Sequence, residues 1–157
     1  MPENIVIALD AMGGDDAPDI VIKGIDIVRV QFPKARFLLF GDEARLEPLL
    51  KAYPGVRDAC ELRHTDEAVK SEDKPSQALR KGRKSSMRLA IDSVRSGEAG
   101  AIVSAGNTGA LMAMAKVSLR MMAGIARPAI ASVLPSPRGA PVRPRPGATA
   151  GAVGGDQ

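Results

Sequence analysis

Two short segments combine glycines with polar side chains, DAMGGD at residues 10–15 and SAGNTGA at residues 104–110. Glycines let backbone N–H groups approach a ligand closely, because no Cβ stands in the way. Each segment follows an apolar run and precedes a stretch with helical spacing. A helix start offers unpaired N–H donors and a partial positive charge, so phosphate is a natural ligand there. The two segments therefore predict an anion-binding site.

Within SAGNTGA, we expect Gly106 to bring the backbone close to phosphate, and Ser104, Asn107 and Thr108 to add side-chain hydrogen bonds. An Asn or Thr at this point of a chain also serves as an ordinary helix N-cap. The alternative interpretation is a plain strand-to-helix turn that Asn107 or Thr108 caps. The sequence leaves both interpretations open.

Within DAMGGD, Asp10 and Asp15 are candidate catalytic carboxylates that act as a base, as a hydrogen-bond acceptor or as a group that orders the ligand. Gly13 and Gly14 provide the backbone geometry of the turn. The alternative is that Asp10 caps a turn, while nearby carboxylates cap the next helix. For that capping role the candidates are Asp15, Asp16 and Asp19, and it is the preferred interpretation for the last two.

A basic segment lies between the two glycine segments, at residues 74–95. Lys74 and Arg80 are candidate phosphate-binding residues because their charges neutralise an anion. If the segment is one helix, Arg80, Lys84 and Arg88 lie four residues apart and share a face. That face would bind phosphate or an acidic protein, whereas a solvated helix face is the alternative for each single residue.

Other kinds of chemistry lack the residues they need. His64 is the only histidine and Cys60 the only cysteine, so Ser-His-Asp, Cys-His and His- or Cys-based metal sites are excluded within this chain. We expect His64 to be structural or on the surface, and Cys60 to be a small buried side chain. Aromatic residues make up only 3% of the chain, which argues against a stacking platform for nucleic acid.

The elements that position these residues alternate between strand and helix. Short, mostly apolar runs predict strands and 3.6-residue periodicity predicts helices. This alternation predicts an α/β fold with a largely parallel sheet flanked by helices, with the functional loops at the carboxyl ends of the strands. The predicted strands are Ile5–Leu9, Arg36–Gly41, Cys60–His64, Ala99–Ser104 and Pro128–Leu134, and the predicted helices are Asp19–Gln31, Glu43–Ala52, Ser76–Arg83, Ser86–Ser96 and Thr108–Met122.

Composition changes abruptly at Pro135. Residues 135–157 are nearly all Pro, Arg, Gly, Ala and Val, without a helical or strand period, which is typical of a disordered tail. We therefore expect an ordered part over 1–134 and a tail over 135–157. The N-terminus has no basic region before its short apolar run and no apolar stretch reaches 18 residues, so we expect neither a signal peptide nor a membrane span.

The segments DAMGGDDAP, KPSQALRKGRKSSMRLAIDSV and SAGNTGALMAMAK occur in an order and spacing that resemble one family. The chain is similar, from about Ile5 to Leu134, to the N-terminal part of the bacterial phosphate acyltransferases. These enzymes of phospholipid synthesis convert an acyl-acyl carrier protein and inorganic phosphate into an acyl phosphate.

The resemblance implies an isopropylmalate-dehydrogenase-like fold, a homodimer, and a cytoplasmic enzyme with peripheral association at the inner face of the membrane. It implies acyl carrier protein and phosphate as partners, and no metal, nucleotide or other cofactor. The family's motif positions fall on Asp10, Gly13, Gly14, Asp15, Ser104, Gly106, Asn107 and Thr108.

The resemblance also implies that the family continues for about as many residues again. We expect a truncated or frameshifted chain whose fold is incomplete. The alternative function is an inactive fragment that binds acyl carrier protein or another anionic partner through the basic segment. Binding of nucleic acid through the basic tail is a further alternative, which the absence of a nucleic-acid motif disfavours.

Overall fold

The computed structural model describes residues 5–121, 123–124, 131–133 and 142–144. The chain forms two compact units, Met1–Leu119 and Arg120–Gln157. All residues of the two glycine segments belong to the first unit, so the first unit is the one that positions the candidate site.

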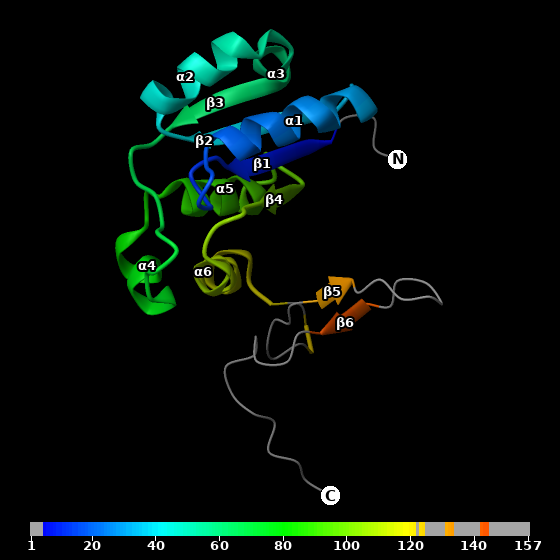
Figure 1. The fold of residues 1–157 in the computed structure, drawn as a ribbon. Coiled ribbons are helices and arrows are strands. Elements are labelled where there is room, and N and C mark those ends of the chain that lie inside the picture. Colours follow the sequence, from blue (N-terminus) through cyan, green and yellow to red (C-terminus); the bar gives the residue numbers. More distant parts are fainter. Residues whose placement is uncertain (1–4, 122, 125–130, 134–141, 145–157) are drawn as a thin grey trace, which may run out of the picture. The chain divides into compact units, whose positions relative to one another are not determined.

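The first unit contains a four-stranded sheet in which every pair of neighbouring strands is parallel (Figure 1). Its strands are β1 (Val6–Asp10), β2 (Arg36–Gly41), β3 (Cys60–His64) and β4 (Ala101–Val103), in the order β3-β2-β1-β4. In the register, Leu9 of β1 lies opposite Leu39 of β2 and Val103 of β4. The predicted α/β fold with a largely parallel sheet is thus confirmed.

Helices cover both faces of this sheet, as the burial of both faces of a parallel sheet requires. One face packs against α1 (Asp19–Gln31), α2 (Glu43–Ala52) and α3 (Pro54–Ala59), and the other against α5 (Ser86–Arg95). Two further helices, α4 (Pro75–Lys81) and α6 (Thr108–Leu119), share a hydrophobic cluster with α5. Figure 1 shows α4 and α6 on the far side of α5 from the sheet.

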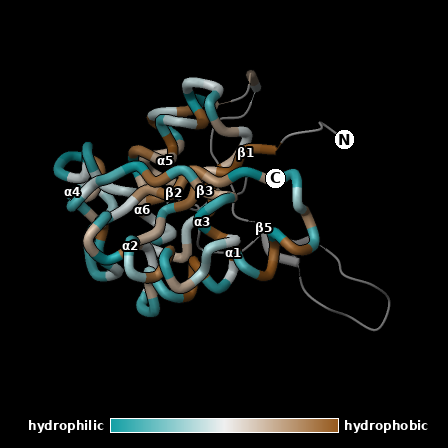
Figure 2. The backbone as a smooth tube through the Cα atoms, turned by 90° about the horizontal axis from the view of Figure 1, so that it is seen from above, coloured by the Kyte–Doolittle hydropathy of each residue, from teal (hydrophilic) through white to brown (hydrophobic). Residues whose placement is uncertain are grey.

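Alternating side chains of the strands build the two cores. Leu9 and Leu39 pack toward α1, whereas Ala8 and Leu38 pack toward α5, because successive residues of a strand point to opposite faces. Figure 2 shows hydrophobic residues concentrated along β1 and β2, in the middle of the unit. Aliphatic residues fill most of these cores, in keeping with the low aromatic content.

Local signals explain most helix boundaries. The Asp42 carboxylate accepts a 2.9 Å hydrogen bond from the backbone N–H of Ala44, so it caps α2. Helix α3 is not among the predicted helices, and it follows α2 directly. Proline is also favoured at the first position of a helix, and here it begins α3.

The capping predicted for the start of α1 is wrong. Pro18 occupies the N-cap position and no side chain caps the helix. Of the carboxylates proposed as caps, Asp19 lies in the first turn and complements the helix dipole.

The basic segment forms two helices, as the helices predicted at Ser76–Arg83 and Ser86–Ser96 implied, so Arg80, Lys84 and Arg88 do not share one helix face. At the end of α4, the backbone N–H of Gly82 donates a hydrogen bond to the Ala78 carbonyl. At the start of α5, the Ser85 hydroxyl caps the helix by accepting from the N–H of Arg88 at 3.3 Å. The turn between them is closed by the Ser85 hydroxyl, which donates to the Gly82 carbonyl at 2.7 Å.

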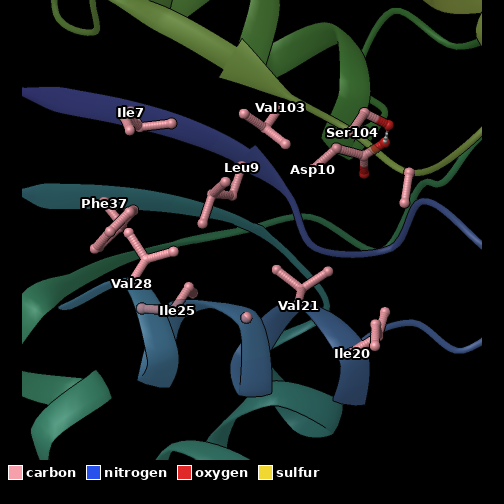
Figure 3. Close-up of a pocket in the computed structure, with 12 residues that line it drawn as sticks. Ile7, Leu9, Asp10, Ile20, Val21, Ile25, Val28, Phe37, Val103 and Ser104 are labelled. Carbon is pink, nitrogen blue, oxygen red and sulfur yellow. Dashed lines mark hydrogen bonds between the residues drawn. The ribbon is translucent and has the colours of Figure 1, made fainter. Parts of the chain in front are cut away.

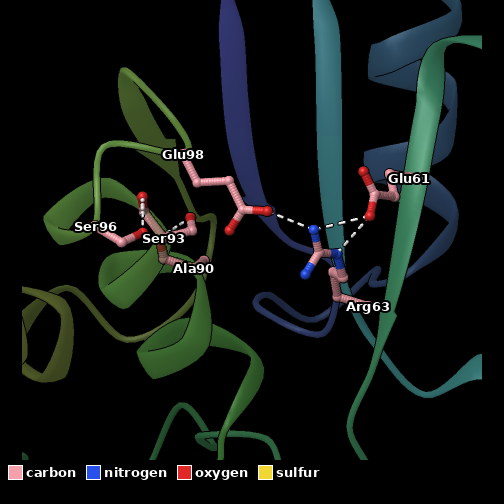
Figure 4. A network of polar contacts seen from close by, with 6 residues as sticks. All are labelled: Glu61, Arg63, Ala90, Ser93, Ser96 and Glu98. Atoms are coloured by element: carbon pink, nitrogen blue, oxygen red, sulfur yellow. Dashed lines mark hydrogen bonds and ion pairs between the residues drawn. The ribbon is translucent and has the colours of Figure 1, made fainter.

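An ionic network joins the outer strand β3 to the turn that follows α5 (Figure 4). The Arg63 guanidinium contacts Glu61 at 2.8 Å and also pairs with Glu98. Gly97, in the same turn, has a φ of +82°, a left-handed conformation that glycine adopts easily after a helix. These contacts fix the path of the chain from α5 into β4.

In the second unit, β5 (Ala131–Val133) pairs with β6 (Val142–Pro144) in an antiparallel arrangement. Strand β5 falls within the strand predicted at 128–134. Strand β6 was not predicted, because the composition after Pro135 showed no strand period, and the other residues of the predicted tail lie outside the described residues. None of the helices that the structure describes is long and apolar enough to cross a membrane.

Candidate functional site

The two glycine segments meet because of the strand order. The chain runs from β1 outward through β2 to β3 and then returns to place β4 on the opposite side of β1. Open α/β sheets bind ligands in a crevice at such a switch point, outside the carboxyl ends of the strands. The loops that follow β1 and β4 are DAMGGD and SAGNTGA, so the strand order places both candidate segments at this crevice.

Asp10, at the end of β1, is the centre of the polar contacts. Its side chain is nearly fully buried, at 2% exposure. One carboxylate oxygen accepts hydrogen bonds from the hydroxyl of Ser86 at 2.6 Å and the backbone N–H of Met12 at 3.3 Å. The other accepts from the hydroxyl of Ser104 at 2.8 Å. The carboxylate thus ties together β1, the start of α5 and the end of β4.

The Asp10 carboxylate helps to shape the second glycine loop through Ser104. Both of its oxygens are engaged, so it holds the Ser104 hydroxyl in place and does not face open solvent. The Ser104 oxygen in turn accepts from the backbone N–H of Gly106 at 3.1 Å, which shapes the second glycine loop. The Asp10–Met12 bond also closes the turn that was the alternative interpretation of Asp10.

Gly13 and Gly106 allow the two loops to touch backbone to backbone. A Cβ atom on Gly13 would lie 2.5 Å from the Asp10 carboxylate and 2.7 Å from the Ser104 hydroxyl. A Cβ atom on Gly106 would lie 3.0 Å from the Cα of Gly13. Gly14 has a φ of +106°, which L side chains rarely adopt. Any larger residue at position 13 would therefore push the loops apart.

Asn107 fixes the start of α6 and a distant loop together. Its side-chain oxygen accepts from the N–H of Ala110 at 3.0 Å, so it is a helix cap, as the alternative interpretation held. Its side-chain nitrogen donates toward the carbonyls of Lys70, Ser71 and Asp73 at 3.2, 3.1 and 2.8 Å. Both polar atoms of the amide are engaged by protein groups, which favours a positioning role for this residue.

The first turn of α6 keeps two N–H groups for a ligand. Asn107 satisfies the N–H groups of Ala110 and Leu111, through its side chain and its carbonyl. Thr108 and Gly109 are exposed, and their N–H groups have no acceptor among the described residues. A Cβ on Gly109 would lie 2.8 Å from Pro75, so the start of α4 abuts the start of α6.

Asp15 is exposed, unlike Asp10, and accepts a 3.4 Å hydrogen bond from the Ser71 hydroxyl. Ser71 also contacts Asn107 through its carbonyl. The loop 70–73 therefore bridges the two glycine segments. Asp15 lies at the rim of the crevice, where a carboxylate remains accessible to a ligand.

The two basic candidates differ in their placement. Lys74 precedes Pro75 directly and is exposed, so it stands at the junction of α4 and α6. Arg80 lies at the other end of α4, where its Nε donates to the Ser76 carbonyl at 3.3 Å. No contact joins Arg80 to the glycine segments among the described residues. The structure thus brings Lys74 to the crevice and does not bring Arg80 there.

Ser86 is the residue at this site that sequence reasoning missed. It is fully buried at the first position of α5, 76 residues along the chain from the carboxylate that it contacts. The sequence shows only a Ser-Ser pair at a helix start, and such a pair is usually a cap. One serine is enough to cap a helix. The second serine of the pair was therefore the signal that Ser86 has another partner.

Cys60 and His64 both belong to the outer strand β3. Burial raises the pKa of the Cys60 thiol to about 12, so this side chain stays a neutral thiol at physiological pH. His64 accepts a hydrogen bond from the Glu43 N–H at 3.2 Å, which is a structural contact. Among the described residues, no group of three or more His, Cys, Asp or Glu side chains is arranged to hold a metal ion.

An apolar groove opens beside the crevice, with a volume of about 300 Å³ (Figure 3). It runs between α1 and the sheet and is lined by aliphatic residues of α1, β1 and β4. Asp10 and Ser104 also belong to its wall and are labelled together in Figure 3. A hydrophobic surface and a polar crevice therefore adjoin at the carboxyl ends of β1 and β4.

Comparison with known proteins gives one consistent family. A family profile described as "Fatty acid synthesis protein" matches residues 5–142. A phosphate acyltransferase of Parvibaculum lavamentivorans is 57% identical over 155 residues, which are 98% of this chain and 43% of that protein. The phosphate acyltransferase of Rhodospirillum rubrum is 56% identical over 139 residues, 88% of this chain and 40% of that protein.

The chain spans less than half the length of these curated relatives. The match includes both glycine segments and the basic segment, so the family suggested by the motifs is confirmed. This chain belongs to the fatty acid synthesis protein family, among whose members its close relatives are phosphate acyltransferases.

Proposed function

We propose that this chain carries the phosphate-binding half of a phosphate acyltransferase site, which transfers an acyl group from an acyl carrier protein thioester to inorganic phosphate. One observation supports this most directly. Two glycine loops contact each other at the switch point of the sheet, beside a helix start with two unpaired N–H groups. Such a crevice suits a small anion, and the relatives' name supplies the reaction.

Phosphate would sit against the exposed N–H groups of Thr108 and Gly109, where the α6 dipole favours negative charge. The exposed Lys74 would add positive charge. A phosphate oxygen then attacks the thioester carbonyl carbon. The new C–O bond replaces the C–S bond, and the departing carrier thiolate takes up the proton that phosphate gives up.

Residues that bond to other protein groups would serve as support in this scheme. Asp10 orients Ser104, and Ser104 holds the Gly106 N–H and so the shape of the loop. Asn107 fixes the direction of α6 against the loop 70–73. Asp15, exposed at the rim, is the carboxylate placed to exchange a proton with bound phosphate. Preorganised donors of this kind lower a barrier because they need no rearrangement during the reaction.

A second candidate function is binding of acyl carrier protein, or another acidic partner, without turnover. It is favoured by a row of exposed basic residues on α4 and the turn after it. These residues are Lys74, Arg80, Lys81, Arg83 and Lys84. Their charges would steer an acidic protein toward the crevice, whether or not the reaction follows.

The test is an assay of acyl-phosphate formation from an acyl carrier protein thioester and phosphate. It compares this chain with a fusion that continues it with the remainder of the Parvibaculum relative. We expect activity in the fusion, and at least a tenfold rise in the KM for phosphate on Lys74→Ala. Lys51→Ala is the matched control, because Lys51 is equally exposed but lies on α2 across the sheet.

An inactive but folded fusion would refute the acyltransferase proposal. A further outcome is that the fusion is active, whereas this chain alone binds the carrier protein without turnover. This chain would then supply only docking and phosphate contacts. An equal change in KM for Lys51→Ala and Lys74→Ala would remove Lys74 from the phosphate site.

A further inference from the structure

Ser86 lies at the start of α5, but its hydroxyl is not used to cap this helix. The neighbouring Ser85 is the cap, because its hydroxyl oxygen accepts from the N–H of Arg88 at 3.3 Å. Ser86 is fully buried, and its hydroxyl donates to a carboxylate oxygen of Asp10 at 2.6 Å. Its backbone N–H donates to the Glu67 carbonyl at 2.9 Å. Groups outside α5 therefore hold both donors of this serine.

The buried Asp10 carboxylate depends on the Ser86 hydroxyl. A buried carboxylate is stable only when hydrogen bonds satisfy its oxygens. Without that hydroxyl, the oxygen that accepts from it would keep one donor among the described residues, the N–H of Met12 at 3.3 Å. The carboxylate would then turn to recover a donor. Its other oxygen, which accepts from the Ser104 hydroxyl at 2.8 Å, would turn with it.

Ser104 connects Asp10 to the second glycine segment. Its hydroxyl donates to Asp10, as Figure 3 shows, and its oxygen accepts from the Gly106 N–H at 3.1 Å. Gly106 also lies against the start of α5, because a Cβ atom on it would lie 3.4 Å from the methyl group of Met87. The start of α5 thus supports the second glycine segment in two ways, by packing and through hydrogen bonds.

We propose that Ser86 is a positioning residue of the candidate site, which fixes the second glycine segment through Asp10 and Ser104. Residues 104–107 lead directly into α6, whose first exposed N–H groups are the phosphate donors of the proposed function. A displaced segment would displace these donors. All of these contacts lie within the first unit. The effect on catalysis rests on the proposed function, whereas the effect on the segment does not.

A positioning role differs from a contribution to stability alone. A residue that only stabilises the fold changes the amount of active enzyme, so its loss lowers the apparent kcat and leaves the KM for phosphate unchanged. A residue that positions the phosphate donors changes that KM. Its effect must also disappear once Ser104, the link to the segment, has been removed.

The first test is the Gly106 amide signal in a proton–nitrogen NMR spectrum of the 157-residue chain. We expect Ser86→Ala and Ser104→Ala each to shift this signal and to accelerate its hydrogen exchange about fivefold, the equivalent of one hydrogen bond. Ser93→Ala is the matched control, because Ser93 is another buried serine of α5, and its hydroxyl donates to the Ala90 carbonyl at 2.8 Å. We expect this control to leave the Gly106 signal unchanged.

The second test measures kinetics in the fusion of this chain with the remainder of the Parvibaculum relative. We expect Ser86→Ala to raise the KM for phosphate about fivefold and to leave the KM for the carrier thioester unchanged. In a Ser104→Ala background, Ser86→Ala should raise the KM for phosphate no further, because the two residues act in series. Ser93→Ala should change neither KM.

An unchanged Gly106 signal in folded Ser86→Ala would overturn the proposal, and so would a lower kcat with an unchanged KM for phosphate. A further rise in that KM in the double variant would also overturn it, because Ser86 would then not act through Ser104. If Ser86→Ala does not fold, Ser86→Cys takes its place with the same expected changes, since a thiol is a weak donor. An inactive fusion without substitutions would refute the proposed reaction, and the Gly106 signal would still decide the positioning role.

Discussion

Replacing Gly13 by alanine tests the contact on which the candidate site depends. The new methyl group would lie 2.5 Å from an Asp10 oxygen, 2.7 Å from the Ser104 hydroxyl and 3.0 Å from the Gly106 nitrogen. Real Cβ atoms do not approach these groups so closely, so the loop must move. That movement would break the 2.8 Å hydrogen bond from the Ser104 hydroxyl to Asp10, which connects the end of β4 to β1.

The magnitude follows from two costs. Overpacking a tight site costs about 1–3 kcal/mol, and losing a hydrogen bond to a charged group costs about 1.5–3 kcal/mol. Together they predict a loss of about 2.5–6 kcal/mol in the free energy of unfolding. That is a large part of the roughly 5–15 kcal/mol that stabilises an ordinary domain.

Gly24→Ala is the matched control, because nothing lies within 4 Å of a Cβ atom at this position inside α1. Alanine in a helix is more stable than glycine by about 0.5–1 kcal/mol. We therefore expect the two Gly→Ala substitutions to change stability in opposite directions.

Urea unfolding followed by circular dichroism is the assay. With a slope of about 1–3 kcal/mol per molar urea, a 3 kcal/mol loss moves the midpoint of Gly13→Ala down by about 1–3 M. A midpoint equal to or above that of the unmodified chain would refute the close contact of the two loops.

Four further predictions concern Ser86, Asn107 and Cys60. Ser86→Ala removes one of the donors to the buried Asp10 carboxylate and should lower the free energy of unfolding by about 1.5–3 kcal/mol, measured by urea unfolding. Asn107→Ala removes the cap of α6 and the link to the loop 70–73, whereas Asn107→Asp keeps the cap; amide exchange in the first turn of α6 should accelerate in the first variant and much less in the second. The Cys60 thiol, with its pKa raised to about 12, should resist alkylation at pH 8 until the chain is unfolded in urea. The raised pKa also makes the free energy of unfolding depend on pH, because the folded chain holds the thiol proton more tightly than the unfolded chain. The contribution of Cys60 to that free energy is fully present below the unfolded pKa of about 8.5 and is lost as pH rises toward 12. Equal alkylation rates in folded and unfolded protein would contradict the burial of Cys60.

Local patterns in the sequence were enough for most elements. A short apolar run predicted the strand Arg36–Gly41, and helical spacing predicted α1 and α2 to within a residue. Where two local signals competed, the prediction failed. Pro54 follows the end of α2 and also begins α3, a helix that was not predicted.

The sequence by itself determined the α/β class, the family and the two glycine segments, because these depend on residue types at short spacing. Only the tertiary structure decided that the segments touch, since contact requires β4 to pair with β1 on the side opposite to β2. The same holds for the hydrogen bond between Ser86 and Asp10 and for the hydrogen bonds from Asn107 to the loop 70–73. A sequence carries no local signal for such pairs, because a buried hydrogen bond forms between whichever groups the packing of strands and helices brings within about 3 Å.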